Sequence, residues 1–145
     1  MTRPDAEPAS IMVQRRIEWA DTDASGFHHN TASFRMIEMA ETALYERLGL
    51  MDLYGRVPRV HIEAEFRKAL RHRDLLDVHF LVTEVGRTSI AYAIRIEHRG
   101  DVAVEGRVVA VLLDAATREP EPWPEDTRKL LLTAGPQRPE LLVDG

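Results

Sequence analysis

The chain contains no cysteine, which excludes disulfides, thiolate metal sites and a cysteine nucleophile. It also lacks a basic excess, because 19 Lys and Arg residues are outnumbered by 24 Asp and Glu residues, for a formal net charge of −5. Domains that bind nucleic acid usually carry an excess of positive charge. We therefore expect no nucleic-acid partner.

Long apolar runs are missing as well. No stretch approaches the roughly 18 consecutive apolar residues that a membrane-spanning helix needs. Residues 1–10 are polar, contain Pro4 and Pro8, and have no apolar segment of the kind that secretory signals carry. We expect a soluble, cytoplasmic protein with no membrane partner.

What the chain does contain is the composition of an ordinary globular domain, with 145 residues, 44% hydrophobic and 30% charged. A domain of this length buries roughly 70% of the surface that its unfolded chain exposes, so its core needs no disulfide or metal. We expect one folded domain over residues 11–133, preceded by a flexible arm at residues 1–10 and followed by a C-terminal tail at residues 134–145.

Hydrophobic periodicity predicts the secondary structure. Apolar residues that alternate with polar ones predict a strand from Ile11 to Trp19. Apolar residues three and four apart predict a long, largely buried helix over about residues 31–48, with Asn30 or Thr31 as its N-cap and Gly49 just past its end. Four further strands are predicted at residues 59–68, 75–85, 88–99 and 102–114, and a short helix at residues 125–132.

This order of elements predicts an α+β domain. A five-stranded antiparallel sheet with one apolar helix buries most apolar surface when the helix packs on one face of the sheet. Arg99-Gly100-Asp101 is a candidate hairpin turn between the last two strands. Free edges of such a sheet often pair across a dimer.

The most informative stretch runs from Asp21 to Gly26, with the sequence Asp-Thr-Asp-Ala-Ser-Gly, and continues through His28 and His29 into the predicted helix. The first N–H groups of a helix lack partners inside the helix and carry partial positive charge. A carboxylate such as Asp23 beside these donors supplies a nucleophile or base and an oxyanion-stabilising group, the two parts that acyl transfer needs. The alternative is that Asp21 and Asp23 only form a cap or a turn.

This loop, the following His28-His29-Asn30 and the helix containing Glu38 and Glu41 resemble the acyl-CoA thioesterases of the 4-hydroxybenzoyl-CoA thioesterase type, in the hotdog-fold superfamily. The resemblance covers roughly residues 11–125, and its most specific part is the Asp-x-Asp-x-x-Gly loop before a long helix. It implies a hotdog fold, in which the five-stranded antiparallel sheet wraps around one long central helix.

The resemblance also implies roles for individual residues. Asp23 matches the catalytic carboxylate, which either attacks the thioester carbonyl or activates a water molecule. Asn30 matches the residue whose backbone N–H polarises that carbonyl, and Gly26 matches the loop glycine that lets the backbone approach the thioester. We place His29 with these catalytic residues and His28 with the substrate-binding ones, although both could simply satisfy backbone groups of the loop.

Other residues are candidates for substrate binding. Phe27 and Met36 suit the wall of an acyl pocket, with plain core packing as the alternative for the helix stripe that contains Met36. Arg87, Thr88 and Ser89 match positions that contact the phosphates or the pantetheine arm of coenzyme A in some relatives. Thioester hydrolysis requires no cofactor, and the spacing of the carboxylates and histidines fits none of the common metal-ligand patterns.

We therefore expect a thioesterase that hydrolyses an acyl thioester of coenzyme A or of an acyl carrier protein, acting as a homodimer or homotetramer. Two alternatives remain on the same fold. One is an enoyl-thioester hydratase or dehydratase that uses an Asp and a His, although the longer signatures of those enzymes are absent. The other is a non-catalytic acyl-binding protein, because a fold by itself does not define a function.

Overall fold

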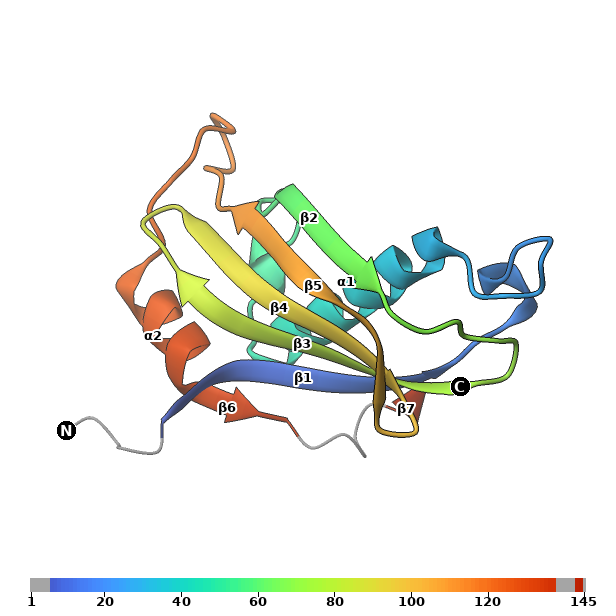
Figure 1. The fold of residues 1–145 in the computed structure, drawn as a ribbon. Helices are drawn as coiled ribbons and strands as arrows, with labels where there is room; N and C mark the ends of the chain where they lie inside the picture. The colour runs from blue at the N-terminus through green and yellow to red at the C-terminus, as the bar shows by residue number, and fades with distance from the viewer. Residues whose placement is uncertain (1–5, 138–142, 145) are drawn as a thin grey trace.

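The computed structural model describes residues 6–137 and 143–144. In this part of the chain, strands and helices follow one another in the order shown in Figure 1. The elements are β1 (Glu7–Arg16), η1 (Trp19–Asp21), α1 (Asn30–Arg47), η2 (Met51–Leu53), β2 (Arg59–Phe66), β3 (Leu75–Val85), β4 (Ser89–His98), β5 (Asp101–Val111), α2 (Glu125–Thr133), β6 (Ala134–Pro136) and β7 (Val143–Asp144).

The strands form one sheet in the order β2-β5-β4-β3-β1-β6, and β7 also pairs with β1. The five expected strands, β1 to β5, pair antiparallel with one another. The expectation of a purely antiparallel five-stranded sheet is nevertheless wrong, because β6 and β7 both run parallel to β1. These added strands are too short to show any alternation in sequence, and they form because β1 offers backbone groups to pair with.

Both ends of the expected domain extend further than its predicted boundaries. Strand β1 begins at Glu7, so part of the expected flexible arm is a paired strand in which Ala9 is fully buried. Strand β6 likewise holds the first residues of the expected tail against β1. The remainder of the arm, residues 1–5, and residues 138–142 and 145 of the tail lie outside the described residues.

Helix α1 begins one residue earlier than predicted, and its N-cap is His29 rather than Asn30 or Thr31. Its buried residues recur at helical spacing, so one face packs on the sheet while the other faces solvent. Gly49 adopts a φ of +70° just past the helix, in the left-handed conformation that favours glycine at this position.

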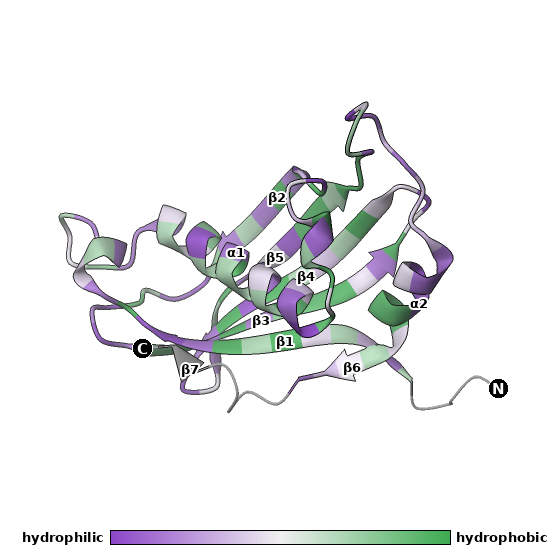
Figure 2. Cartoon of the chain, turned by 180° about the vertical axis from the view of Figure 1, so that it is seen from behind, coloured by the Kyte–Doolittle hydropathy of each residue, from purple (hydrophilic) through white to green (hydrophobic). Residues whose placement is uncertain are grey.

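The core lies between α1 and the sheet. Figures 1 and 2 show α1 running along one face of the sheet, as expected for the hotdog arrangement. Alternate residues of β3 and β4 point toward the helix, and Phe80 and Tyr92 lie side by side with ring centroids 4.3 Å apart. The Tyr92 hydroxyl lies 2.6 Å from the Tyr45 hydroxyl of α1, so this buried polar pair satisfies itself.

Two local predictions about turns and helices are confirmed. The β4–β5 hairpin turns through Arg99 and Gly100, whose φ values of 51° and 81° are those of a type I′ turn. Helix α2 follows Pro124, which serves as its N-cap. It packs against β1 and β3 at the end of the molecule opposite the loop between β1 and α1 (Figure 1).

Candidate active site

Asp21 anchors the loop that leads into α1. Its side chain is only 2% exposed and forms a two-pronged pair with Arg15 of β1, with N–O distances of 2.7 and 3.1 Å. It also accepts a hydrogen bond from the Glu18 N–H, and Arg35 of α1 reaches it at 3.4 Å. Burial opposes ionisation, yet these donors hold the pKa of the Asp21 carboxyl below its usual value. The loop is thereby tied to both a strand and the helix.

The loop between Asp21 and α1 closes on itself. The N–H of Asp23 donates to the carbonyl of Phe27 at 3.0 Å, and the N–H of Gly26 donates to the carbonyl of Asp23 at 3.0 Å. Gly26 has a φ of +85°, which residues other than glycine rarely adopt. The turn itself therefore requires glycine at this position. The sequence analysis expected glycine there for a different reason, the approach of the backbone to the substrate.

The Asp23 carboxylate lies exposed at the tip of this loop. One of its oxygens accepts hydrogen bonds from the Ser25 N–H, at 2.8 Å, and from the Ser25 hydroxyl. These bonds lower the pKa of Asp23, so the group is ionised at neutral pH. Its other oxygen has no partner among the described residues and is free to act as a nucleophile or base.

The start of α1 leaves one backbone donor free. The His29 ring accepts a hydrogen bond from the Thr31 N–H, and the carbonyl of His29 accepts one from the Ala32 N–H. Within the described part of the chain, the N–H of Asn30 has no such partner. Because first-turn N–H groups carry partial positive charge, this donor suits the oxyanion of a thioester under attack.

A cavity of about 310 Å³ opens beside this helix start. Phe27, His28 and Asn30 line one side of it, and Phe66 and Leu70 help to line the other. The loop is docked there by a hydrogen bond from the His28 N–H to the Leu70 carbonyl. Three predicted site residues thus meet at one cavity, while Asp23 is tied to its rim through the backbone bond to Phe27.

His28 is the partly buried histidine of the pair. Its Nε2 atom is buried and has no hydrogen-bond partner among the described residues. Burial lowers the pKa of His28, so the ring is neutral near pH 7. Because this nitrogen has no accessible surface, it is placed to bond to a buried water molecule rather than to a substrate group.

The remaining predicted substrate-binding residues lie elsewhere. Met36 is 1% exposed within the core, so it packs in the interior rather than lining a cavity. Arg87, Thr88 and Ser89 form the β3–β4 turn, at the opposite end of β3 from the Asp23 loop. Their carbonyls accept hydrogen bonds from the Trp123 N–H, the Leu112 N–H and the Trp123 indole N–H, the last to Ser89 at 3.0 Å. Within a single chain, this turn lies away from the cavity.

Sequence reasoning missed two contacts of the loop, Phe66 on the far wall of the cavity and Arg71 over the Phe27 ring. Phe66 ends β2 and is 42% exposed, and Arg71 lies over the Phe27 ring at 5.2 Å from its centroid. Both sit in a segment whose strand pattern carries no functional motif. They reach the loop only because the chain after β2 returns to pair Arg71 with Phe27.

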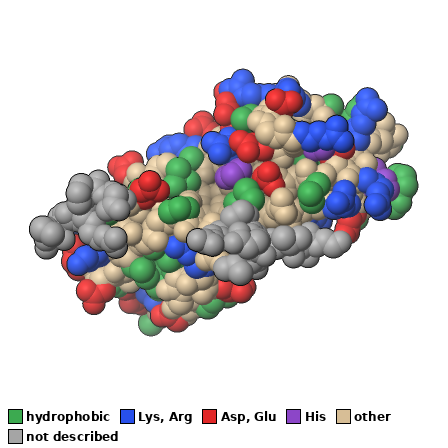
Figure 3. All heavy atoms as spheres, turned by 90° about the horizontal axis from the view of Figure 1, so that it is seen from below, with side chains coloured by type: hydrophobic (Ala, Val, Ile, Leu, Met, Phe, Trp, Pro, Cys, Tyr) green, Lys and Arg blue, Asp and Glu red, His purple; other side chains and the backbone are tan. Residues whose placement is uncertain are grey.

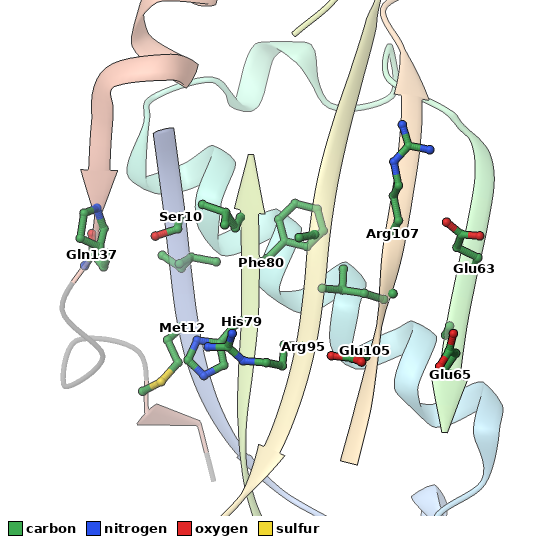
Figure 4. A pocket seen from close by; sticks show the side chains of 17 residues that line it. Ser10, Met12, Glu63, Glu65, His79, Phe80, Arg95, Glu105, Arg107 and Gln137 are labelled. Carbon is green, nitrogen blue, oxygen red and sulfur yellow. The ribbon is translucent and has the colours of Figure 1, made fainter. Parts of the chain in front are cut away.

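A larger groove of about 930 Å³ lies on the face of the sheet that points away from α1, and none of the predicted site residues lines it. Figure 4 shows the charged side chains that project into it, among them His79, Arg95, Glu105 and Arg107. Acidic and basic groups alternate there, and Figure 3 shows the same mixture on the face seen from below. This groove offers no nucleophile beside a free helix N-terminus.

Comparisons with known proteins agree with this description. Residues 17–131 match the family described as the thioesterase-like superfamily. The chain is 26% identical over 124 residues to 1,4-dihydroxy-2-naphthoyl-CoA hydrolase of Synechococcus elongatus, covering 81% of this chain and 91% of the relative.

Solved structures share the fold. A predicted thioesterase from Bacillus stearothermophilus superposes with a TM-score of 0.77 at 24% identity, over 84% of this chain and 93% of that one. A variant of 4-hydroxybenzoyl-CoA thioesterase in complex with 4-hydroxybenzoyl-CoA superposes with a TM-score of 0.75 at 21% identity, over 84% and 98%. Both confirm the hotdog arrangement.

The fold and the loop define a hotdog-type thioesterase domain. The chain belongs to the thioesterase-like superfamily, which confirms at the level of the family that it is a thioester hydrolase. Among the residues that the structure describes, no helix is both long and apolar enough to cross a membrane.

Proposed function

We propose that the protein hydrolyses an acyl thioester of coenzyme A to the free acid and the thiol, with an acyl carrier protein as the alternative carrier. The single observation that carries this proposal is the unpaired N–H of Asn30, which lies at a cavity beside the loop of Asp23. The name of the Synechococcus relative supports coenzyme A as the carrier. Because coenzyme A thioesters are intracellular metabolites, the proposal places the protein in the cytoplasm.

The proposed reaction uses the free Asp23 oxygen in one of two ways. It attacks the carbonyl carbon and expels the thiolate, leaving a mixed anhydride that water then hydrolyses, or it takes a proton from a water molecule that attacks instead. In both cases the Asn30 N–H donates to the oxygen that becomes negative in the transition state.

The sheet supports a homodimer built on the edge strand β2. Val60, Ile62 and Phe66 are 61%, 42% and 42% exposed there, and the outer edge of β2 has no partner strand within the described chain. Antiparallel pairing of β2 with a second copy, centred on Ile62, would place His61 of each copy opposite Glu63 of the other. Such pairing satisfies the open backbone groups and covers the apolar side chains.

Free-thiol release from a panel of acyl-CoAs tests the proposal. Wild-type protein should release thiol, and Asp23→Asn should lose about 10²-fold or more of that rate, a size typical of removing an acid–base group. Asp126→Asn on α2, far from the loop, serves as the matched control and should keep the wild-type rate. Binding of acyl-CoA with no thiol release by wild-type protein would instead indicate a non-catalytic acyl-binding protein.

A further inference from the structure

An exposed tryptophan lies just before the loop that carries Asp23. The Trp19 side chain is 73% exposed, more than any other large apolar side chain in the described part of the chain. Its indole stacks on the His72 ring, with ring centroids 3.7 Å apart and an angle of 18° between the ring planes. The stack fixes the orientation of the indole and leaves most of its surface open. An exposed, oriented aromatic ring of this kind is typical of surfaces that stack a flat ligand.

A hollow of about 450 Å³ opens beside this stack. Trp19 and His72 line it together with Arg16, the last residue of β1, and Arg73, in the turn before β3. The Arg16 guanidinium donates to the Arg73 carbonyl at 2.7 Å, which holds it at the hollow. Figure 3 shows Lys and Arg side chains gathered at the end of the molecule that carries the β1–α1 loop.

The hollow carries a local excess of positive charge. Neither Arg16 nor Arg73 forms an ion pair with a carboxylate among the described residues. Glu18 is the one acidic side chain in the described lining of the hollow. The chain as a whole has a net charge of −5, so this excess is specific to the surface around Trp19. Guanidinium groups beside a flat aromatic surface suit phosphates attached to a stacked base.

The backbone at Arg73 gives this arginine a reason beyond the turn itself. Its φ is +78°, in the left-handed region that residues other than glycine rarely adopt. The Arg73 N–H donates to the Ile17 carbonyl at 2.9 Å, so a contact with the chain after β1 holds the strained conformation. Glycine would form the same turn without strain, whereas arginine adds a cation to the wall of the hollow. Strain of this kind is concentrated at functional sites.

The segment between β2 and β3 joins the hollow to the candidate active site. Leu70 lines the active-site cavity, and Arg71 lies over the Phe27 ring of the same cavity. The next two residues, His72 and Arg73, line the hollow. The Cα atoms of Leu70 and Arg73 are at most about 11 Å apart, because each residue advances the chain by no more than 3.8 Å. A ligand whose reacting end lies in the cavity can therefore reach the hollow with its other end.

We propose that this hollow binds the nucleotide end of coenzyme A, with the adenine stacked on Trp19 and the phosphates held by Arg16 and Arg73. Coenzyme A carries its thiol on a long pantetheine arm, whose other end is joined to a 3′-phosphorylated adenosine diphosphate. The arm connects the cavity to the hollow. This inference rests on the proposed thioesterase function. It places the nucleotide away from the Arg87-Thr88-Ser89 turn that the sequence resemblance implies.

Adenosine 3′,5′-bisphosphate tests the site without catalysis, because it carries the base and the 3′-phosphate of coenzyme A but no thioester. The chain has two tryptophans, and the other, Trp123, is only 4% exposed. Stacking on Trp19 should therefore quench the intrinsic tryptophan fluorescence in a saturable way. Trp19→Phe should abolish this quenching and retain binding in calorimetry. Trp19→Ala should weaken binding by about tenfold or more, the size of losing one stacked base.

Arg73→Gly removes the guanidinium and relieves the left-handed backbone, so a lost affinity would not reflect a strained fold. It should weaken bisphosphate binding by about fivefold or more, as expected for an exposed charged contact to phosphate. Arg118→Gly is the matched control, because Arg118 also has a positive φ, of 62°, and donates to the Gly55 carbonyl in the turn after β5. This turn lies at the opposite end of the molecule (Figure 1), so Arg118→Gly should keep the wild-type affinity.

Matched thioesters connect the hollow to turnover. Each acyl-CoA that the wild type hydrolyses is compared with the pantetheine thioester of the same acid, which lacks the nucleotide. The wild-type KM should be about tenfold or more lower for the acyl-CoA at a similar kcat, because the nucleotide binds equally in the ground and transition states. Trp19→Ala and Arg73→Gly should raise the KM of the acyl-CoA and leave that of the pantetheine thioester unchanged.

The outcomes separate this assignment from the proposed function. Equal KM values for the two thioesters, or bisphosphate binding that survives Trp19→Ala and Arg73→Gly, would overturn the nucleotide site and leave the thioesterase intact. Turnover of acyl carrier protein thioesters with no binding of the bisphosphate would also overturn it. Saturable binding at Trp19 without thiol release from any thioester would support the site and overturn hydrolysis. Thermal unfolding of each variant shows whether a changed affinity comes from a misfolded protein.

Discussion

The Nδ1 atom of His29 accepts a hydrogen bond from the Thr31 N–H at 3.1 Å and lies 2.7 Å from the Thr31 hydroxyl. The ring that sequence comparison places among the catalytic residues therefore caps helix α1. This cap occupies the second N–H of the helix, whereas the first, that of Asn30, has no partner among the described residues. His29 thus shapes the proposed oxyanion site through the backbone.

Substitution of His29 separates capping from chemistry. His29→Ala should lower the free energy of unfolding by about 1 kcal/mol, because the Thr31 N–H loses its side-chain acceptor. His29→Asn restores a good N-cap and should recover both the stability and most of the thioesterase rate. Urea unfolding and thiol release measure the two properties, and a stable His29→Asn protein without activity would show a direct chemical role for the imidazole.

Asp21 should contribute stability that depends on pH. Asp21→Asn removes the buried carboxylate that pairs with Arg15 and accepts a hydrogen bond from the Glu18 N–H. It should lower the free energy of unfolding by about 2–3 kcal/mol at pH 7, as expected for hydrogen bonds to a charged group. Because the pKa of Asp21 is lowered in the folded protein, its contribution is complete above the ordinary value of 3.8 and is lost as the pH falls below it. The difference between wild type and variant in chemical unfolding should therefore shrink toward pH 3. A constant difference would contradict this account.

Protonation of His28 should also lower the stability of the folded protein as the pH falls, but in a different pH range. Burial lowers its pKa, so the unfolded chain takes up a proton first as the pH falls through about 6.5, and the folded state loses stability from there downward. His28→Gln should flatten the stability profile between about pH 6.5 and pH 5, near the ordinary pKa of histidine. An unchanged stability profile in His28→Gln would contradict this account.

Gly106 should tolerate no side chain. A Cβ at this position of β5 would lie 1.9 Å from the Glu63 carbonyl oxygen and 2.8 Å from the Ala64 Cα, both backbone atoms of the paired strand β2. Gly106→Ala should therefore displace β2 and lower the free energy of unfolding by about 1–3 kcal/mol or more, the range observed when a packed site is overfilled. At Gly86 the close atom is the hydroxyl oxygen of Ser89, which can rotate away. Gly86→Ala should be nearly neutral in thermal unfolding, and equal effects of the two changes would contradict the close approach of β2.

Periodicity predicted those elements that bury an apolar face. Strand β3 has its predicted bounds, Leu75–Val85, because its alternate residues pack on α1. The N-cap of α1 was misplaced by one residue because histidine is a weak capping signal in sequence, and only the closed loop brings its ring to the Thr31 N–H. Strands β6 and β7 carry no periodic signal and exist through pairing with β1.

The residues of the candidate site likewise divide into those that the sequence predicts and those that only the folded structure brings together. Asp23, Gly26 and Asn30 belong to one contiguous motif, so a resemblance over that motif was enough to single them out. Phe66 ends β2 and Leu70 follows that strand, and no local pattern links either residue to the loop that it faces. Glu41 is buried on α1 and pairs with Arg59, a contact that the local spacing of residues does not encode.

The sequence by itself determined a single α+β domain, a long helix preceded by an Asp-x-Asp-x-x-Gly loop, and the class of chemistry that such a loop supports. These properties follow from residues close together in the chain, where spacing sets which side chains share a face. The tertiary structure decided which backbone donor stays open, which residues line the cavity and which carboxylate of α1 is buried against Arg59. Those properties arise when distant segments pack together, because burial and hydrogen-bond satisfaction depend on neighbours that local spacing does not encode.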